Sequence, residues 1–392
     1  MKYTDKPHPA SRAPVVVIAP DSYKGSATAA QVARAIGHGL RQGCPQVQQL
    51  HAPMADGGEG TLDCVAAACR GAWRQTTIDA IHGRPVAAEW YDCGDGLAVI
   101  ESARVLGLPL VQTHADAPGI HQRSSHALGV LLRTVLDAGA RRILVGLGGS
   151  ACNDAGLGLL TALGCVPNGR DGHSLTPDMN GLIALDTLSC ASLDPRLAHT
   201  DIRVLCDVDN PLLGARGASR IYGPQKGLGD DEIEAVDAAC HRLAQIWQET
   251  DLGNRPGSGA AGGLGFALAA IGGQLQPGAD TLIEMTGLRA RLATADRVIT
   301  GEGRSDAQTL SGKLPLTIAR LAPAGRTVLV SGAIDTQARQ ALDRYFVACH
   351  ALTDYAGSSR AAQLEPARWL RHAGQHIGRD LAARDNATRG HE

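Results

Sequence analysis

The sequence predicts an α/β protein of two α/β domains, one of them doubly wound, Rossmann-like and assembled from both ends of the chain. Short, continuous apolar runs are typical of buried parallel strands, and helical patterns follow them. Runs of the same kind return near the C-terminus. The length of 392 residues exceeds what one hydrophobic core usually serves, which favours a second domain.

The N-terminal part opens with two strand–helix units. Each strand is a short apolar run that ends close to an aspartate, Asp21 or Asp56. In the first helix, apolar residues recur at four-residue spacing, and Ser26 or Thr28 can serve as the N-cap. The predicted elements are strands over 14–20 and 47–54 and helices over 26–40 and 61–69.

The C-terminal part repeats this pattern with three β-branched strands and a closing helix. The first of these strands ends close to Glu302, and the second ends at Gly332. Because strands of one style lie at both ends of the chain, we expect a single doubly wound sheet that is split between the termini. The predicted elements are strands over 296–300, 327–331 and 345–352 and a helix over 365–383.

The middle of the chain has a different pattern, with two paired strands joined around Gly94-Asp95-Gly96. The predicted elements here are strands over 85–90, 97–100, 142–146 and 202–205 and helices over 128–138, 153–163 and 230–250. We therefore expect a discontinuous domain over 14–75 and 285–384, an inserted α/β domain over 76–284, and disordered tails over 1–13 and 385–392.

Composition excludes several classes of protein. The formal net charge of −2 leaves no basic field for nucleic acid. No apolar run approaches the ~20 residues of a membrane span, and the polar N-terminus lacks the apolar core of a signal peptide. The ten cysteines form no CxxC pair, so we expect a cytoplasmic protein with buried, reduced thiols such as Cys165, Cys240 and Cys349.

Motifs of other enzyme classes are absent or incomplete. The chain has no P-loop and no GxSxG elbow. A GxGxxG match at 257–262 follows a polar stretch, so we interpret it as a turn of backbone N–H groups that could bind an anion. A GxGxxA match at 146–151 follows a strand, but Asp154 would repel a pyrophosphate, which argues against a nicotinamide cofactor. Five histidines lie in unrelated contexts: His51, His82, His121, His126 and His173.

Four acidic residues lie at or just beyond the carboxyl ends of predicted strands, where open α/β sheets place their ligands. They are Asp21, Asp56, Asp207 and Glu302. Any one of them alone would most simply serve as a helix cap or a turn residue. Together with nearby charged and amide side chains they match the needs of phosphoryl transfer, which uses carboxylates on Mg²⁺, cations on the phosphoryl group and a base. These neighbours are Lys24, Glu59, Asn210, Lys226, Arg304, Asp306 and Lys313.

Seven motifs occur in order along the chain: APDSYKGS, ADGGEGT, GLGGSACNDAG, CDVDNPLLGARGAS, YGPQKG, PGSGAAGGLG and TGEGRSDAQTLSGK. In these motifs the chain resembles the bacterial glycerate kinase family, the class that includes enzymes of glucarate, galactarate and glyoxylate breakdown. The resemblance covers about Val15 to Ala383. The chain departs from the family pattern at Tyr23, where Phe is common, at Ala155, where Gly is common, and in a looser stretch over 124–129.

This resemblance implies ATP-dependent phosphorylation of D-glycerate with Mg²⁺, and enzymes like this are expected to give 2-phosphoglycerate. It also implies two α/β domains, a flavodoxin-like one formed from both termini and an inserted one. We expect the substrates, which are small molecules, to bind in a cleft between the domains. Whether the protein forms a homodimer is left open.

Our hypothesis gives each group of residues a role. Asp306 is the first candidate for the base and Asp56 the second, while Lys24 and Arg304 pair with the glycerate carboxylate or the transferring phosphoryl group. Asp207 and Glu302 are the candidate Mg²⁺ ligands. The remaining candidates for substrate or phosphate binding are Asp21, Ser22, Ser26, Gly57, Gly58, Glu59, Gly148, Gly149, Ser150, Asn153, Asn210, Lys226, Gly257, Gly259, Gly262 and Lys313.

Two alternative functions share these motifs. A kinase for another small hydroxy acid would need the same charged residues, and a panel of acceptors would distinguish it. A non-catalytic protein that binds a nucleotide or a metabolite would need the fold without the chemistry, and the completeness of the charged set argues against it.

Overall fold

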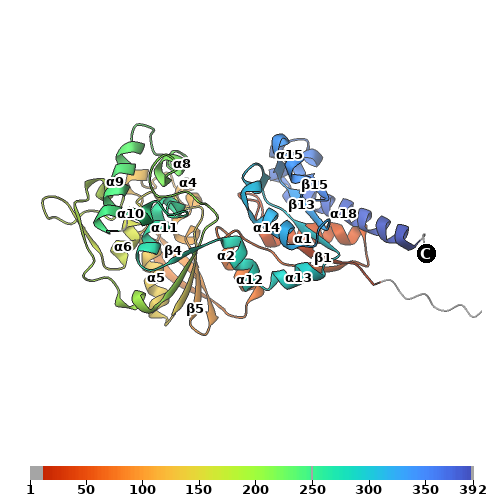
Figure 1. Cartoon of the computed structure of the whole chain (residues 1–392), viewed down its shortest axis with the longest axis horizontal. Helices are drawn as coiled ribbons and strands as arrows, with labels where there is room; N and C mark the ends of the chain where they lie inside the picture. The colour runs from red at the N-terminus through yellow and green to blue at the C-terminus, as the bar shows by residue number, and fades with distance from the viewer. Residues whose placement is uncertain (1–11, 249, 390–392) are drawn as a thin grey trace, which may run out of the picture. The chain divides into compact units, whose positions relative to one another are not determined.

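The computed structural model describes residues 12–248 and 250–389. The chain forms two compact units, shown in Figure 1. The first unit is built from the chain before Ala55 and the chain after Thr286, and the second unit is Ala55–Thr286. Among the described residues, no helix combines the length and the apolarity needed to cross a membrane.

The first unit is organised around a parallel sheet of five strands with the order β15-β13-β11-β1-β2. Numbered by their occurrence along the chain, these strands have the order 2-1-3-4-5 of flavodoxin-like sheets. The α/β fold class is thus confirmed, and in this unit both ends of the chain supply strands to one sheet. The strands are β1 (Val15–Ile18), β2 (Gln48–His51), β11 (Arg297–Thr300), β13 (Thr327–Ser331) and β15 (Ala348–Ala351).

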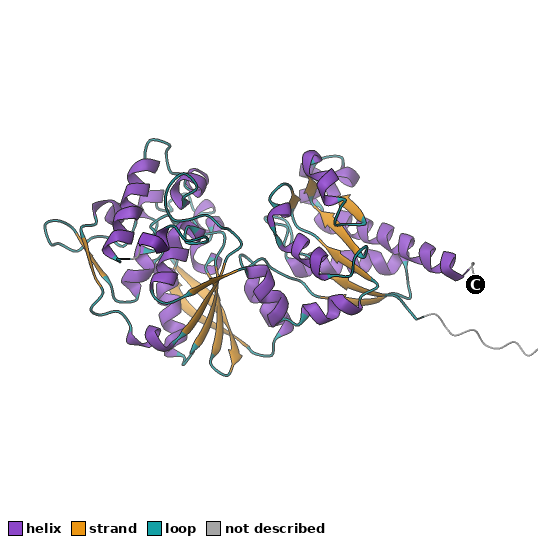
Figure 2. Cartoon of the chain, in the orientation of Figure 1, coloured by secondary structure: helices purple, strands orange, loops and turns teal. Residues whose placement is uncertain are grey.

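Burial explains why these segments are strands. The Val16, Val17 and Ile18 side chains of β1 are fully buried, as expected for a central parallel strand that is covered on both faces. Helices lie on both sides of the sheet, and Figure 2 distinguishes the two kinds of element. The helices and short strands are α1 (Ala29–Gly43), α13 (Leu288–Thr294), α14 (Leu314–Leu321), α15 (Thr336–Leu342), α16 (Leu352–Ala356), α17 (Ser359–Leu364), α18 (Pro366–Arg389), the 3₁₀ turn η4 (Thr309–Ser311), β12 (Arg304–Ser305) and β14 (Ala333–Ile334).

Helix α1 shows how the sequence pattern leads to packing. Thr28 is its N-cap and forms a capping box with Gln31. Thr28 is one of the two N-cap residues that the sequence predicted. The helix lies along α18 (Figure 1), and glycines allow the two backbones to approach closely. A Cβ atom on Gly39 would lie 1.8 Å from the Arg371 carbonyl oxygen, and one on Gly374 would lie 2.2 Å from the Ile36 carbonyl oxygen. Any side chain at these positions would therefore push the two helices apart.

The second unit contains a mixed sheet of six strands with the order β10-β9-β6-β5-β4-β3. Strands β10, β9, β6 and β5 are parallel, and β4 and β3 are antiparallel additions at one edge. The strands are β3 (Ala72–Asp79), β4 (Pro85–Gly94), β5 (Leu97–Glu101), β6 (Arg142–Gly146), β9 (Asp201–Leu205) and β10 (Gln274–Gln276), with a separate hairpin of β7 (Val166–Asn168) and β8 (Thr187–Ser189).

One face of this sheet forms the largest part of the core. Ile143, Val145, Ile202 and Val204 pack there against apolar side chains of helix α5 and its neighbours. The helices of the second unit are α2 (Thr61–Ala68), α3 (Ala103–Leu106), α4 (Leu108–Gln112), α5 (His126–Asp137), α6 (Leu157–Ala162), α7 (Met179–Ala184), α8 (Ala218–Tyr222), α9 (Ile233–Ile246), α10 (Thr250–Gly253), α11 (Ala260–Ala270) and α12 (Gly278–Met285), with 3₁₀ turns η1 (Ile120–Gln122), η2 (Pro195–His199) and η3 (Pro224–Lys226).

The boundary between the units differs from the predicted one. The predicted boundary falls after residue 75, which lies inside β3, whereas the first unit ends at Met54. Strand β3 is mostly exposed and lacks an apolar run, so its pattern gave no strand signal. Its pairing with β4 places it in the second unit. The return boundary, Thr286, lies close to the expected residue 284.

Two further expectations are corrected by the structure. Helix α18 extends to Arg389, so residues 385–389 belong to a helix and not to a disordered tail. Residues 1–11 and 390–392 lie outside the described part of the chain. The helix predicted over 153–163 begins only at Leu157, because Ala155 and Gly156 have left-handed backbone angles, with φ of 52° and 77°.

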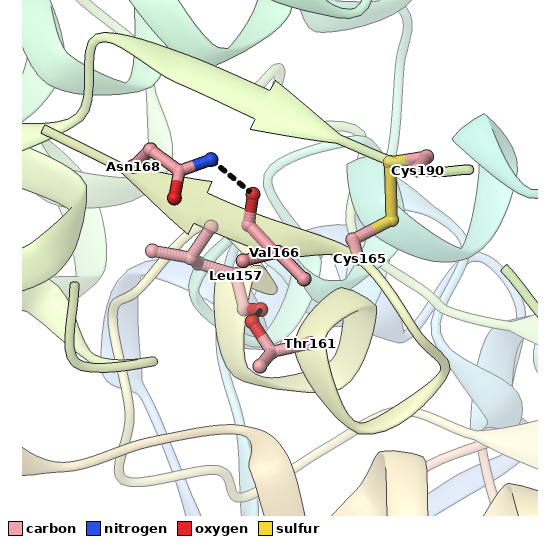
Figure 3. Close-up of a disulfide and its surroundings, with 6 residues drawn as sticks. All are labelled: Leu157, Thr161, Cys165, Val166, Asn168 and Cys190. Atoms are coloured by element: carbon pink, nitrogen blue, oxygen red, sulfur yellow. Dashed lines mark hydrogen bonds between the residues drawn. A yellow bond between two sulfur atoms is a disulfide. The ribbon is translucent and has the colours of Figure 1, made fainter. Parts of the chain in front are cut away.

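The expectation that all the cysteines are reduced is wrong for one pair. Cys165 and Cys190 form a disulfide, which Figure 3 shows with its surroundings. Cys165 directly precedes β7 and Cys190 directly follows β8, so the antiparallel pairing of these strands brings the two residues together. A spacing of 25 residues carries no motif, so this pair has no recognisable signature in the sequence. The other eight cysteines are not in disulfides.

Candidate active site

In the first unit, two predicted acidic residues flank the point where the strand order reverses, between β1 and β11. Open α/β sheets bind ligands at such switch points. Asp21 follows β1 and Glu302 follows β11, and both side chains are buried. The Asp21 N–H donates to the Gly301 carbonyl oxygen over 2.8 Å, which joins the two loops. Burial, and then the charges of Glu302 and Asp21, raise the pKa of the Tyr23 hydroxyl, which donates to the Val330 carbonyl oxygen at 2.6 Å.

The Glu302 carboxylate is held by hydroxyl groups and a lysine. Its Oε1 accepts hydrogen bonds from Thr309 Oγ1 at 2.6 Å and Ser305 Oγ at 3.0 Å. Its Oε2 lies 3.6 Å from Lys313 Nζ. Burial raises the pKa of Glu302, while the Thr309 hydroxyl and the charge of Lys313 lower it. Glu302, a candidate Mg²⁺ ligand, and Lys313, a candidate for substrate or phosphate binding, therefore form one ion pair at the switch point.

The other candidates of the first unit lie in the two loops beside this pair. Lys24 is exposed, and Arg304 is exposed and pairs with Asp335 at 3.6 Å. Asp306 Oδ1 accepts from the Gln308 N–H at 2.8 Å, so one of its oxygens forms a turn.

The two serines of the first loop differ in their contacts. Ser26 Oγ donates to the Tyr23 carbonyl oxygen at 3.1 Å, which indicates a turn role in place of ligand binding. The Ser22 hydroxyl is buried and, among the described residues, has no hydrogen-bond partner. Buried polar groups are nearly always paired, so the Ser22 hydroxyl can serve a ligand without losing a protein contact.

In the second unit, the candidate loops meet at the carboxyl ends of the parallel strands. A Cβ atom on Gly57 would lie 2.9 Å from both Gly278 Cα and Leu205 Cβ. A Cβ atom on Gly148 would lie 2.7 Å from Gly58 Cα. The loop after residue 55, the turn after β6 and the end of β9 are thus in direct contact, and glycine is needed where they touch.

Asp56 and Asp207 form a pair of carboxylates at this edge. Asp207 Oδ1 accepts from Gly278 N at 2.7 Å and from Ala279 N at 3.4 Å, at the N-terminus of α12. Burial of the carboxyl group, and then the charge of Asp56, raise the pKa of Asp207 to about 7, although part of the residue is exposed. Asp56 Oδ1 accepts from Gly58 N at 2.9 Å, and Glu59 is exposed.

Lys226 joins three of the predicted motifs. Its buried Nζ donates to the Cys152 carbonyl oxygen at 2.7 Å and to Ser150 Oγ at 3.4 Å. A Cβ atom on Gly262 would lie 3.0 Å from the same Nζ. Burial lowers the pKa of Lys226, and no ion pair of this lysine is found within the described ranges. Nearby, Asn153 Nδ2 donates to Ser219 Oγ at 2.9 Å, and its buried Oδ1 has no hydrogen-bond partner among the described residues.

Three candidates serve mainly the fold of their own loops. Gly259 N–H donates to the Asn210 carbonyl oxygen at 3.0 Å, so it is not available to an anion as predicted. Asn210 Oδ1 accepts from Tyr222 Oη at 2.6 Å, and its Nδ2 donates to the Arg216 carbonyl oxygen at 2.9 Å. Gly257, with φ of 83°, packs against Cys206.

Gly149 differs from these three candidates, because it has φ of 65° and is exposed.

The sequence analysis missed Glu101 and Ser102, which end β5 at the same edge and are buried. Glu101 follows the apolar run 97–100, the same signal that identified the other acidic residues. It also missed the HxxxH spacing of His372 and His376, whose Nε2 atoms lie 3.1 Å apart on α18 beside Tyr355. This cluster lies outside the two strand edges described here.

The donor set fits Mg²⁺ bound with a nucleotide. Mg²⁺ is usually held by one or two carboxylates together with phosphate oxygens and water. Asp56 with Asp207 is a pair of this kind, and Asp21 and Glu302 flank the switch point of the first unit. Among the described residues no group of three or more His, Cys, Asp or Glu side chains is arranged to hold a metal.

Residues 16–382 match the sequence profile of the glycerate kinase family. The chain belongs to the glycerate kinase family. It is therefore a phosphotransferase, as the sequence predicted. The profile covers all seven motifs from which the resemblance was drawn.

Individual relatives agree with this assignment. The chain is 41% identical over 312 residues to the glycerate 2-kinase of Escherichia coli K12, covering 78% of this chain and 81% of that protein. It is 39% identical over 313 residues to the glycerate kinase of Bacillus subtilis 168, covering 78% and 81%. A crystal structure of a Salmonella typhimurium LT2 protein assigned as glycerate kinase 2 superposes with a TM-score of 0.78 at 35% identity, covering 95% of this chain and all of that one.

Proposed function

We propose that this protein transfers the γ-phosphoryl group of ATP to D-glycerate and that the product is 2-phosphoglycerate. The names of the relatives support glycerate as the substrate. The Escherichia coli relative, a glycerate 2-kinase, supports phosphorylation of the 2-hydroxyl. The observation that carries the proposal is the Glu302–Lys313 pair at the switch point, because it combines a fixed carboxylate with a cation at the place where such sheets bind ligands.

In the proposed reaction, a hydroxyl oxygen of glycerate attacks the γ-phosphorus, and the bond from that phosphorus to the bridging oxygen breaks to release ADP. The hydroxyl proton passes to a carboxylate, for which Asp306 is the first candidate and Asp56 the second. Lys24 and Arg304 pair with the glycerate carboxylate or the transferring phosphoryl group, since both side chains are exposed and cationic. These roles assign residues of both units to one reaction, and a cleft between the units remains a prediction.

Asp207 and Glu302 remain the proposed Mg²⁺ ligands, with Asp56 close to Asp207. The ion would neutralise charge that develops on the phosphates. In support, Asp207 uses one oxygen for the N-terminus of α12, and its other oxygen accepts no protein hydrogen bond among the described residues. Glu302 has less freedom, because both of its oxygens already contact protein donors.

The backbone N–H groups of the Gly148–Ser150 turn, together with buried Lys226, are the proposed phosphate contacts of the second unit. A kinase for another small hydroxy acid would share every one of these features, and a panel of acceptors separates the two. A cytoplasmic location is a prediction that belongs to the same proposal.

The test mixes the purified protein with D-glycerate, ATP and Mg²⁺ and follows the products by phosphorus NMR. A 2-phosphoglycerate signal is expected. A 3-phosphoglycerate signal would support the glycerate kinase activity but contradict the proposed position of the phosphorylated hydroxyl. ADP without a phosphorylated acid would indicate another acceptor or simple hydrolysis, and no ADP at all would favour the binding-protein alternative.

The metal proposal is tested with Asp207→Asn, which keeps the shape of the side chain and the acceptor for Gly278 N–H. The Mg²⁺ concentration for half-maximal rate should rise at least tenfold, while the melting temperature without metal stays close to that of the parent. Asp209→Asn, an exposed carboxylate two residues away that pairs with Arg216, is the matched control. An unchanged Mg²⁺ dependence of Asp207→Asn would remove this residue from the metal site.

A further inference from the structure

Two adjacent residues outside the proposed site, Glu101 and Ser102, end strand β5 at the edge where the glycine loops of the second unit meet. Their side chains are almost completely buried, with exposed fractions of 1% and 0%. Nothing in the chemistry proposed above uses either of them. Their contacts are with the backbones of two different loops.

Glu101 holds the loop that carries Asp56. Its Oε1 accepts from Gly60 N at 3.2 Å, and its Oε2 accepts from Leu62 N at 3.2 Å. Both amides lie at the junction of this loop with helix α2, where a negative charge also interacts favourably with the helix dipole. Each carboxylate oxygen therefore takes one backbone N–H, a pattern that an amide side chain cannot reproduce.

Glu101 has no direct ion pair within the described part of the chain. The nearest cation, Arg104, contacts Glu89 at 3.0 Å and Asp63 at 3.2 Å. Burial raises the pKa of Glu101 to about 6. A buried carboxylate without an ion pair is an expensive way to stabilise a fold, because the charge loses its hydration. Its position beside a functional loop is better explained by a requirement of that loop.

Ser102 holds the second loop. Its Oγ donates to the Gly148 carbonyl oxygen at 3.2 Å and is the acceptor for the Gly148 N–H at 3.3 Å. Its own N–H donates to the Gly146 carbonyl oxygen at 2.9 Å. One side chain thus fixes both polar groups of Gly148, and the backbone beside it continues the β5–β6 pairing into the turn.

The two loops also touch each other directly. A Cβ atom on Gly148 would lie 2.7 Å from Gly58 Cα, so no side chain fits between them. Asp56 Oδ1 accepts from the Gly58 N–H, which places that contact one hydrogen bond away from a candidate catalytic carboxylate. A displacement of either loop must therefore be transmitted to the other.

We propose that Glu101 and Ser102 are positioning residues for phosphoryl transfer: together they hold the Asp56–Gly60 loop and the Gly148–Ser150 turn in one register. In this arrangement Asp56 and the backbone N–H groups of the turn act on the same phosphoryl group. The inference rests on the function proposed above. Neither side chain touches the substrates, and each acts through the loop that it holds.

The test compares Glu101→Gln and Ser102→Ala with the parent, with Glu89→Gln as the control. Glu89 is a half-exposed carboxylate on neighbouring β4 that pairs with Arg104, so its variant removes one charge from the same region. Glu101→Gln and Ser102→Ala should each lower kcat at least tenfold, with KM for ATP and glycerate changed less than threefold, because misplaced loops weaken transition-state contacts more than ground-state binding. Glu89→Gln should keep the parental kcat.

Stability separates positioning from a purely structural role. Glu101→Gln removes a buried charge and loses one hydrogen bond, and these effects offset each other, so the melting temperature should change by no more than a few degrees. A folded Glu101→Gln variant with parental kcat would overturn the proposal. If this variant does not fold, Ser102→Ala decides alone, and parental kcat in that variant overturns the proposal as well.

Hydrogen exchange of backbone amides tests the inference without any substrate. The Ser102 side chain contacts only the Gly148 region. In Ser102→Ala, exchange should nevertheless become faster in the Asp56–Gly60 loop too, since the two loops move together. Faster exchange confined to the Gly148 turn would overturn the coupling. If the parent protein fails to phosphorylate glycerate but shows this coupled exchange, the proposed function fails while the positioning of the loops stands.

Discussion

The Lys226 ammonium lies 2.7 Å from the carbonyl oxygen of Cys152, inside the second unit and away from any carboxylate partner in the described ranges. A buried lysine that contacts only neutral oxygens keeps much of its charge available for an anion, although burial lowers its pKa. It also joins the motif around Ser150 to the motif around Gly262.

Lys226→Met should therefore lower kcat/KM by 10²-fold or more, as expected when one transition-state contact is lost. The melting temperature should change little, because methionine fills a similar volume and removes a buried charge. Steady-state kinetics and a thermal melt measure the two effects. Arg220→Met, which removes an exposed cation of α8, is the control. Parental turnover in Lys226→Met would assign the lysine to the fold alone.

Lys24→Ala tests whether the loop after β1 in the first unit takes part in the reaction. Lys24 is exposed in the loop after β1, so its removal should leave the melting temperature unchanged. The rate should fall by 10²-fold or more if the ammonium contacts the transferring group or the glycerate carboxylate. Arg360→Ala, an exposed cation on α17, should keep full activity. Near-parental turnover of Lys24→Ala would remove this lysine from the site.

Asp306→Asn separates the charge of Asp306 from its role in the turn. The asparagine oxygen can still accept the Gln308 N–H that Asp306 Oδ1 accepts at 2.8 Å, so the loop should keep its shape. Turnover should be abolished and ATP binding, measured by calorimetry, should be retained, because only the proton acceptor is lost. An active variant would transfer the base role to Asp56, the second candidate.

The Cys165–Cys190 disulfide predicts a thiol count. Protein purified without reductant and then denatured should show eight reactive thiols, and reduction should raise the count to ten. Replacing both cysteines with alanine should destabilise the second unit by about 3.5 kcal/mol, the loop-entropy value for a closure of this length. The paired double variant at Cys64 and Cys69, neither of which is in a disulfide, controls for lost packing. Ten reactive thiols before reduction would contradict the disulfide.

Glu101 predicts a pH dependence of stability. Its pKa is about 6 in the folded protein against an ordinary value of 4.5, so the folded state holds the proton more tightly than the unfolded state does. Stability should therefore fall as pH rises from 4.5 to 6 and stay constant above that, by up to roughly 2 kcal/mol. Glu101→Gln should lack this loss.

Denaturant unfolding at pH 5 and pH 7.5 can follow this difference through the tryptophans of the second unit, Trp73, Trp90 and Trp247. The gap between the parent and Glu101→Gln should widen at the higher pH in favour of the variant. Equal pH dependence of the two proteins would show that Glu101 is not a perturbed carboxyl group.

Several features were predictable because they depend on short stretches of chain. Apolar β-branched runs such as Val15–Ile18 and Thr327–Ser331 have one stable environment, the inside of a parallel sheet, and both are strands of the first unit. Thr28 caps α1 because its hydroxyl and Gln31 are three residues apart, which is a local relationship. Strand β3 escaped prediction because its mostly exposed side chains leave no apolar pattern.

By itself the sequence determined that its apolar β-branched runs are strands, that both ends of the chain share one style of strand, and that acidic residues follow strands. Only the tertiary structure decided that Asp21 and Glu302 flank one switch point, that Glu101 and Ser102 hold two glycine loops, that Gly259 N–H is already bonded, and that Cys165 meets Cys190. The reason is physical: backbone periodicity depends on neighbours along the chain, whereas pairing of strands and of side chains depends on which distant segments pack together.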